Sequence, residues 1–310
     1  MIDSRVFSRV MNGISTKKYE ETATVLPETF GIKRSSVSRR FIKTCAAKLQ
    51  TLRERDLSGF DIVAIFIDGK AFADNEIIIA LGVTMTGEKV ILGLIEASSE
   101  NTSVCRDFIK DLVDRGLKID QGILFIIDGS KGIRAGIKSV LGHKAFIQRC
   151  QWHKRENIVS YLSTKEQQRF RCKLERALAV PDEEKSRRYL AAIGTELQTM
   201  NESAYKSLQE GFEEILTLHR LRLPKELVTS LRTTNPIENL NSLLGQYTDR
   251  VDCWKTSNQR QRWVASALLE IEPRLRKLRG FRALSALRDS MKVAMGKDDM
   301  RSKQKELKVA

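Results

Sequence analysis

The chain has 310 residues, 41% of them hydrophobic and 30% charged, which is typical of a globular protein with one large domain or two to three small ones. Its 54 Lys and Arg residues outnumber its 39 Asp and Glu residues, and the net charge of +15 favours a polyanionic partner, with an ordinary basic protein as the alternative. No apolar run approaches the roughly 18 residues of a membrane-spanning helix, and the N-terminus lacks the pattern of a signal peptide, so we expect no membrane partner.

Cysteine usage indicates a reducing compartment. The chain has five cysteines, an odd number, and they are widely spaced in a sequence without an export signal. We therefore expect reduced thiols in the cytoplasm. The five are Cys45, Cys105, Cys150, Cys172 and Cys253.

Residues 1–59 are predicted to form a helical, helix-turn-helix-like DNA-binding region. The segment Phe30–Phe41 has a glycine-containing turn, a hydroxyl-rich helix start near Ser35 and several basic side chains, as helix-turn-helix recognition segments have. An amphipathic helical hairpin with a solvated basic face is the alternative. The residues that we expect to contact DNA are Lys33, Arg34, Ser36, Arg39 and Arg40.

Continuous apolar runs replace the helical pattern after Phe60 and predict a β-sheet. Three runs, Ile62–Ile67, Glu76–Val83 and Val90–Ile95, are separated by short connections. Connections of this length join antiparallel neighbours, so the three strands are expected to form an antiparallel meander.

An amphipathic helix around Phe108 separates the meander from a fourth strand, Ile123–Ile127. A helical crossover permits parallel pairing and is right-handed by the usual rule. If the fourth strand lies beside the first, Asp68 and Asp128 stand at equivalent carboxyl ends of neighbouring strands, with their backbones about 5 Å apart.

Asp68 and Asp128 together predict a cation site. Two carboxylates this close repel each other unless a cation lies between them. Hard oxygen ligands suit Mg²⁺ or Mn²⁺, usually with phosphate oxygens that complete the coordination shell. The alternative is that each Asp-Gly pair is an ordinary turn after a strand.

A Cys-x-x-His pair, Cys150 and His153, follows a helix at Lys131–Leu141 and a fifth strand at Ala145–Gln148. The pair supplies two ligands and a structural zinc needs four. No other cysteine or histidine has a matching spacing, so the sequence disfavours zinc and leaves a structural role or a role beside the active site.

Two later stretches are distinguished by composition. Residues 159–231 are rich in Glu, Lys, Arg, Ala and Leu at helical periods and predict an all-helical insertion. Residues 281–310 form a basic C-terminal tail that is a candidate for contact with phosphate, with a solvated disordered end as the alternative.

A helix is predicted to begin at Asn235, because asparagine is a good N-cap and Pro236 suits the first helical position. Glu238 comes three residues after this cap, as in a capping box. Glu238 therefore has two candidate roles: it completes the cap, or it brings a third carboxylate to Asp68 and Asp128.

A series of short motifs runs in order from about Ser15 to Arg282. They are Asp68-Gly69, Ala80–Val83, Glu100-Asn101, Ile127–Gly129, Gln148–Cys150 with His153-Lys154, and Thr233–Asn241. In these motifs the chain resembles the Mutator-type bacterial transposases, the insertion sequence 256 family.

The resemblance implies an α/β fold: an RNase H-like core with a mixed five-stranded sheet, formed by residues 60–158 and 232–280 and interrupted by the helical insertion. It also implies that Asp68, Asp128 and Glu238 form a DDE triad that binds Mg²⁺ or Mn²⁺. Two further matches have no assigned role. They are the Cys150–His153 signature and Trp263, for which a core aromatic is an equal expectation.

The implied function is DDE-type transposition, with metal-dependent cleavage and strand transfer of an insertion sequence. The implied partners are the inverted-repeat ends of the element, target DNA and a further copy of the chain, at the bacterial nucleoid. Members usually have more sequence before the segment that corresponds to Ser15, so we expect a shortened member. The alternatives are a decayed transposase that only binds DNA and an RNase H-like nuclease that cuts without joining.

Overall fold

The computed structural model describes Phe7, Val10, Met11 and residues 34–72, 75–97, 101–249, 251, 254 and 256–309. For Arg34 and residues 297–309 it describes the backbone alone. Residues 30–33 of the predicted helix-turn-helix segment, including Lys33, lie outside the described residues, as do Glu100 and Cys253. The helix that was predicted to start near Ser35 is α3 (Arg34–Arg53), and it begins within two residues of the expected start.

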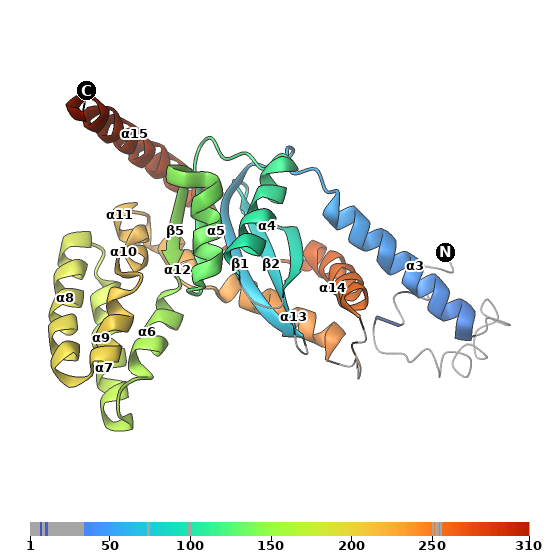
Figure 1. The fold of residues 1–310 in the computed structure, drawn as a ribbon, viewed down its shortest axis with the longest axis horizontal. Helices are drawn as coiled ribbons and strands as arrows, with labels where there is room; N and C mark the ends of the chain where they lie inside the picture. The colour runs from blue at the N-terminus through green and yellow to red at the C-terminus, as the bar shows by residue number, and fades with distance from the viewer. Residues whose placement is uncertain are drawn as a thin grey trace.

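Five strands form one mixed sheet in the order β3-β2-β1-β4-β5 (Figure 1). Strands β1 (Ile62–Phe72), β2 (Asn75–Thr84) and β3 (Lys89–Ala97) form an antiparallel meander. Strand β4 (Ile123–Ile127) pairs in parallel with β1, and β5 (Ala145–Arg149) pairs in parallel with β4. The meander and the position of the fourth strand beside the first are thus confirmed.

Strand β1 is longer than the sequence predicts. The apolar run ends at Ile67, but β1 pairs with β2 as far as Phe72, opposite Asn75. Asp68-Gly69 is therefore part of a strand and not a turn. Because Gly69 has no Cβ, there is room beside it for the carboxylate of Glu76 on β2.

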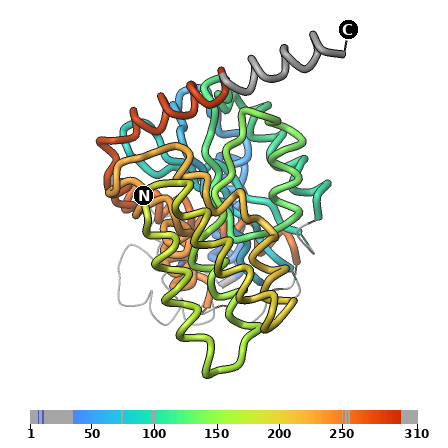
Figure 2. The backbone as a smooth tube through the Cα atoms, turned by 90° about the vertical axis from the view of Figure 1, so that its left-hand side faces the viewer, coloured from blue at the N-terminus to red at the C-terminus, as the bar shows by residue number. Residues whose placement is uncertain are grey.

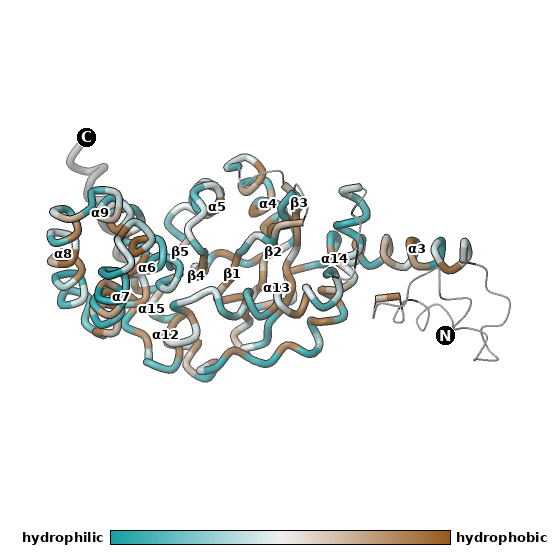
Figure 3. The backbone as a smooth tube through the Cα atoms, turned by 90° about the horizontal axis from the view of Figure 1, so that it is seen from below, coloured by the Kyte–Doolittle hydropathy of each residue, from teal (hydrophilic) through white to brown (hydrophobic). Residues whose placement is uncertain are grey.

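Helices cover both faces of the sheet because strand residues alternate between the two faces. Ile65 and Ile67 point to one face, where α4 (Thr102–Asp114) and α5 (Lys131–Leu141) bury their apolar sides. Phe66 on the same strand belongs to the core of the opposite face. In Figure 3 hydrophobic, brown segments run along the strands, which have helices on both sides.

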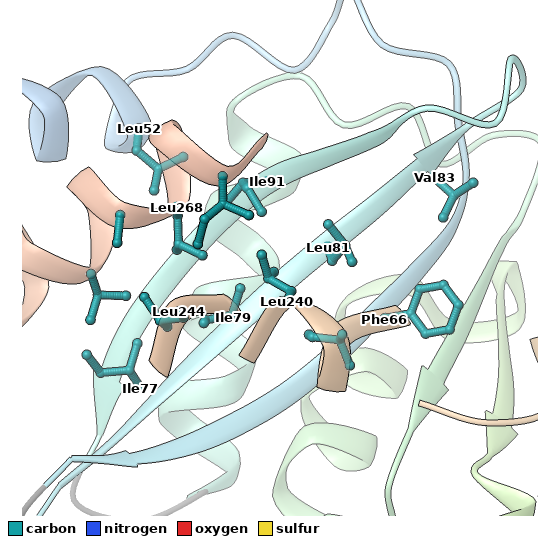
Figure 4. Close-up of a cluster of buried hydrophobic side chains, with 14 of the residues drawn as sticks. Leu52, Phe66, Ile77, Ile79, Leu81, Val83, Ile91, Leu240, Leu244 and Leu268 are labelled. Atoms are coloured by element: carbon teal, nitrogen blue, oxygen red, sulfur yellow. The ribbon is translucent and has the colours of Figure 1, made fainter. Parts of the chain in front are cut away.

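The opposite face is covered by helices from the two ends of the chain. They are α3, α13 (Asn235–Thr248), α14 (Ser257–Ile271) and the first half of α15 (Leu284–Val309), with the short helices η3 (Glu272–Arg274) and η4 (Phe281–Ala283) between α14 and α15. Figure 4 shows Leu240 and Leu244 of α13 against Ile79 and Leu81 of β2. This packing sets the position of α13 relative to the sheet.

The segment between β5 and α13 is helical throughout. Its helices are α6 (Gln151–Val159), α7 (Thr164–Ala179), α8 (Glu183–Met200), α9 (Glu202–Gln209), α10 (Phe212–Ile215), α11 (Thr217–Arg220) and α12 (Lys225–Leu231). Helices α6 to α10 share a core of their own, which includes Phe170, Leu190 and Leu208. Figure 2 shows this bundle in front of the sheet when the molecule is seen end on.

Hydrogen bonds from α11 fix the helical segment to the edge strand β5. The short helix η2 (Gly142–Lys144) precedes β5. The Thr217 hydroxyl donates to the Ile147 carbonyl at 2.6 Å, and the Leu218 amide donates to Gln148 Oε1 at 3.0 Å. Buried polar groups that are satisfied in this way favour a single docked arrangement. The motif residue Gln148 therefore has a structural role.

The basic tail is a helix whose first half belongs to the core. Leu284, Leu287 and Met291 of α15 are fully buried. Arg288 is 5% exposed and donates hydrogen bonds to the carbonyls of Gly122 and Ile62. Arg288 is thus committed to the protein interior, contrary to the expectation that the tail as a whole is free to contact phosphate.

Candidate active site

Asp68 and Asp128 lie next to each other at the centre of the sheet. The last pair in the parallel register of β1 and β4 is Ile67 with Ile127, and each aspartate directly follows its member of this pair. β4 ends at Ile127, whereas β1 continues past Asp68. The aspartates therefore stand where the parallel pairing ends.

The environment of Asp68 disfavours its charged form. Burial raises the pKa of Asp68 to about 6, and the negative charges of Asp128 and Glu238 act in the same direction, while His153 opposes them. A carboxylate with this pKa is poorly solvated and lies among like charges. Such an environment is typical of sites that bind a cation or a proton.

Glu238 lies in the first turn of α13, but the predicted capping box is wrong. The N-cap is Thr234 rather than Asn235, and its side chain makes no hydrogen bond to the amides of the first turn. The Thr234 hydroxyl donates instead to Glu238 Oε1 at 2.6 Å. With Thr234 as the N-cap, Asn235 is the first helical residue and Pro236 the second. Glu238 is then four residues after the N-cap, whereas a capping box needs it three residues after.

Asn241 is a site residue that the sequence did not single out. Its side-chain amide donates to Asp68 Oδ2 at 2.8 Å, and its Oδ1 is buried without a hydrogen-bond partner among the described residues. Lys70 Nζ donates to the Asn241 carbonyl at 2.8 Å. The available signal was its place three residues after Glu238, on the same side of the helix.

Glu76 was also missed. Its pKa is raised by burial and by the charge of Asp128, so its carboxylate lies within electrostatic reach of the aspartates. In the sequence Glu76 is only the first residue of an apolar run. The turn that brings it back beside Gly69 could not be located, because the extension of β1 was not predicted.

Cys150 and His153 lie beside Glu238. His153 Nδ1 is 3.9 Å from Glu238 Oε1, and Cys150 is fully buried. The hydrogen bond that His153 makes with Cys150 raises the pKa of His153. Burial acts to raise the pKa of Cys150, but hydrogen bonds with His153 and Thr234 lower it overall.

Within the described part of the chain, no three His, Cys, Asp or Glu side chains lie close enough together to hold a metal ion. This applies to Cys150 with His153 and also to the three carboxylates. Glu238 Oε1 is held by Thr234 in this arrangement.

Trp263 packs away from these residues. Its Nε1 donates to the Tyr247 carbonyl at 2.9 Å, and its ring centroid lies 4.8 Å from that of Phe41. It thereby joins α14 to α13 and α3. Its role is that of an aromatic at the edge of the core.

The described candidates for DNA contact lie on α3. Arg39 and Arg40 are exposed, and Ser36 is partly buried. Arg39 Nε donates to the Ser35 carbonyl within the same helix. These residues and the two aspartates lie on different elements, and contact of the α3 residues with DNA stays a prediction.

The family described as "Transposase, Mutator family" matches residues 1–272, which is most of the chain. The chain belongs to this family. Membership confirms the resemblance that the ordered motifs indicated. No helix in the described residues is both long enough and apolar enough to cross a membrane.

Individual relatives are distant. The chain is 27% identical over 282 residues to the transposase for insertion sequence element IS406 of Burkholderia multivorans, a match that covers 84% of this chain and 68% of the relative. It is 24% identical over 278 residues to the transposase for IS256 in transposon Tn4001 of Staphylococcus aureus, covering 84% and 67%. A match to the transposase for IS1081 of Mycobacterium tuberculosis is 26% identical over 273 residues and covers 83% and 62%.

Proposed function

We propose that this chain is a DDE-type transposase that cleaves and joins the DNA of an insertion sequence. The observation that carries the proposal is the adjacency of Asp68 and Asp128 in a member of the Mutator transposase family. Glu238, at the start of the helix that packs over the same sheet, is the third carboxylate. We further propose that the sheet and its covering helices are an RNase H-like core into which residues 159–231, with α7 to α12, are inserted.

The donor set suits a hard divalent cation such as Mg²⁺ or Mn²⁺. Burial, followed by the negative charges of Asp128 and Glu238, raises the pKa of Asp68, and a bound cation would favour its charged form. The buried Oδ1 of Asn241, which no described residue satisfies, is a further oxygen of the preferred kind. Asp68, Asp128 and Glu238 are the residues that would bind the metal, which when bound activates the attacking hydroxyl or water and stabilises the leaving oxygen.

The protein's own side chains orient these groups. Asn241 fixes one oxygen of Asp68, and Lys70 fixes the backbone of Asn241. Both contacts join α13 to β1, so the helix that presents Glu238 is hydrogen-bonded to the strand that presents Asp68. Basic side chains of the chain, which total 54, would neutralise the DNA backbone and position it without reading its sequence.

The proposed partners are the ends of an insertion sequence, target DNA and a second copy of the chain, in the bacterial cytoplasm. If neutralisation of phosphates dominates binding, the affinity for duplex DNA falls steeply with salt concentration. A flat dependence on salt would contradict this part of the proposal.

The central test is the replacement Glu238→Gln, with Glu184→Gln as the matched control. Glu184 is exposed on α8, and Glu184→Gln makes the same change in charge on a different helix from Glu238. Purified protein is incubated with DNA that carries the element's inverted repeats, Mg²⁺ and a target plasmid. We expect Glu238→Gln to retain DNA affinity and lose cleavage and joining, since glutamine is a poor ligand for a hard cation.

The control is expected to cleave and join as the wild type does. If Glu238→Gln retains near-normal strand transfer at saturating Mg²⁺, Glu238 is not the third carboxylate and the DDE assignment fails. If the wild type cuts and never joins, the nuclease alternative replaces transposition.

A further inference from the structure

The hydroxyl of Thr234 is the centre of a cluster that connects the Cys-x-x-His motif to Glu238. Its Oγ1 lies 2.6 Å from Glu238 Oε1, 3.2 Å from His153 Nδ1 and 3.3 Å from Cys150 Sγ. Thr234 and Cys150 are both completely buried. A buried hydroxyl with three polar neighbours is held in one orientation.

The number of protons sets the direction of these hydrogen bonds. A threonine hydroxyl has one proton and two lone pairs. The ionised carboxylate of Glu238 can only accept, and its contact is the shortest, so the Thr234 proton goes to Glu238. The lone pairs of the Thr234 oxygen are then free to accept from His153 Nδ1 at 3.2 Å, and Cys150 Sγ lies 3.3 Å from the same oxygen.

Backbone hydrogen bonds tie this cluster to the end of β4. The Cys150 amide donates to the Ile127 carbonyl at 2.8 Å, one residue before Asp128. The Gln151 amide donates to the Arg232 carbonyl at 2.9 Å, two residues before Thr234. The start of α6 therefore joins the end of β4, which Asp128 follows, to the segment between α12 and α13 that leads to Thr234 and Glu238.

The two oxygens of Glu238 differ in their surroundings. Oε1 accepts from Thr234 and lies near His153, whereas no described residue hydrogen-bonds Oε2. Carboxylates that bind metals are commonly held in this way, with outer hydrogen bonds to one oxygen that orient the other.

We propose that Cys150, His153 and Thr234 are positioning residues that fix Glu238 Oε1 and thereby orient its second oxygen toward a divalent cation. This inference rests on the proposed function of Glu238. It gives the Cys-x-x-His pair a task without zinc, because the pair acts through Thr234 on a carboxylate. The typical loss on removal of such an outer contact is about 10- to 100-fold in metal affinity or activity.

The first test compares Thr234→Val with Thr234→Ser in the full chain. Valine keeps the shape and removes the hydroxyl, whereas serine keeps the hydroxyl and removes the methyl group. Mn²⁺ binding is measured directly by the fraction of free Mn²⁺ in electron paramagnetic resonance, beside the melting temperature and the joining rate at saturating DNA. We expect Thr234→Val to bind Mn²⁺ about 10-fold more weakly and Thr234→Ser to bind it within about twofold of wild type.

A second pair keeps the inference testable if Thr234→Val does not fold. In His153→Asn the amide group can occupy the position of Nδ1, whereas in His153→Gln it reaches the position of Nε2. We expect Asn to retain most of the Mn²⁺ affinity and Gln to lose it about as Thr234→Val does. The inference is overturned if wild-type Mn²⁺ affinity survives in Thr234→Val or His153→Gln, or if both members of each pair lose it equally.

Glu238→Gln separates the two proposals. If that variant binds Mn²⁺ and joins DNA as the wild type does, the proposed function of Glu238 fails first. If it loses both while Thr234→Val and His153→Gln keep both, Glu238 remains the third carboxylate and only the positioning role is overturned.

Discussion

The side-chain amide of Asn241 on α13 donates a 2.8 Å hydrogen bond to Asp68 on β1, across 173 positions of sequence. This contact compensates part of the like-charge environment of Asp68, to which Asp128 and Glu238 contribute. Asn241→Asp replaces the donor by a carboxylate of the same size. We expect it to destabilise the metal-free protein by about 1–3 kcal/mol at pH 8, measured by urea unfolding.

The effect of Asn241→Asp is expected to reverse when metal is added. An additional carboxylate beside Asp68 attracts a divalent cation, so Mg²⁺ should stabilise the variant more than the wild type. Asn239→Asp is the control, because Asn239 is exposed on the same helix. Equal stabilisation of all three proteins by Mg²⁺ would show that no cation binds beside Asp68.

Asp68 also gives the metal-free protein a predictable response to pH. Its folded pKa of about 6 lies above the unfolded value of 3.8, mainly through burial. The stability that comes from protonation of Asp68 is therefore fully present below pH 3.8 and is lost as the pH rises through about 6. Asp68→Asn removes this loss, and we expect it to stabilise the metal-free protein by about 1–3 kcal/mol at pH 7.5.

Unfolding in the presence of a chelator at pH 4 and pH 7.5 checks the prediction for Asp68. The gain from Asp68→Asn should shrink at pH 4, where the wild-type carboxyl already has its proton in the folded state. A gain of equal size at both pH values would mean that the pKa of Asp68 is not raised.

The strand order was predictable because it depends on short-range features. The short connections between the first three apolar runs permit only hairpins, and the helix before Ile123 permits a parallel return. The adjacency of Asp68 and Asp128 depended on one further condition, that the fourth strand lies beside the first, and the structure supplies it. By contrast, β1 continues through Gly69 to Phe72, where the sequence has no apolar run. Its extension depends on pairing with β2, which no local pattern reveals.

The details around Glu238 were not predictable for a different reason. Asn235 is the better N-cap by residue type, but Thr234 occupies the N-cap position. The partners of Thr234, Cys150 and His153, come from the start of α6. Tertiary contacts thus override the local preference for a cap. The bond from Asn241 to Asp68 likewise depends on how Leu240 and Leu244 seat α13 on the sheet.

Gly136 offers a test of the packing that supports β4. It lies within α5, where alanine would ordinarily stabilise a helix by about 1 kcal/mol. A Cβ at Gly136 would lie 2.7 Å from the backbone nitrogen of Arg106 on α4, which cannot move without separating the helices. We expect Gly136→Ala to destabilise the protein by about 1–3 kcal/mol in urea unfolding.

Gly296→Ala is the matched control for Gly136→Ala. Gly296 is also helical, and a Cβ there meets nothing within 4 Å. We expect it to leave stability unchanged or raise it by less than about 1 kcal/mol. The two substitutions should therefore have opposite or clearly different effects, and equal effects would contradict the close approach of α4 and α5.

Glu210 holds two buried cations where the helical bundle meets the sheet. Its carboxylate accepts from Arg149 at 3.1 and 3.2 Å and from Lys154 at 3.0 Å, and these two residues are 5% and 1% exposed. Although burial acts to raise it, the hydrogen bonds from Arg149 and Lys154 lower the pKa of Glu210 to about 2. Glu210→Gln removes the carboxylate that hydrogen-bonds both cations. We expect a loss of about 2–4 kcal/mol at pH 7, less than for a fully buried pair because Glu210 itself is 40% exposed.

The dependence on pH distinguishes this charge effect from a loss of packing. Because the folded pKa of Glu210 is lowered, the charge on Glu210 stabilises the folded protein above pH 4.5, and this stabilisation is lost as the pH falls through about 2. The unfolding free energies of wild type and Glu210→Gln should therefore differ at pH 7 and converge toward pH 2. Glu202→Gln removes an exposed carboxylate that pairs with Lys206 at the start of α9, the helix that ends just before Glu210, and should leave stability close to that of the wild type. A difference between wild type and Glu210→Gln that persists unchanged to pH 2 would mean that side-chain shape, and not the charge on Glu210, holds Arg149 and Lys154 in place.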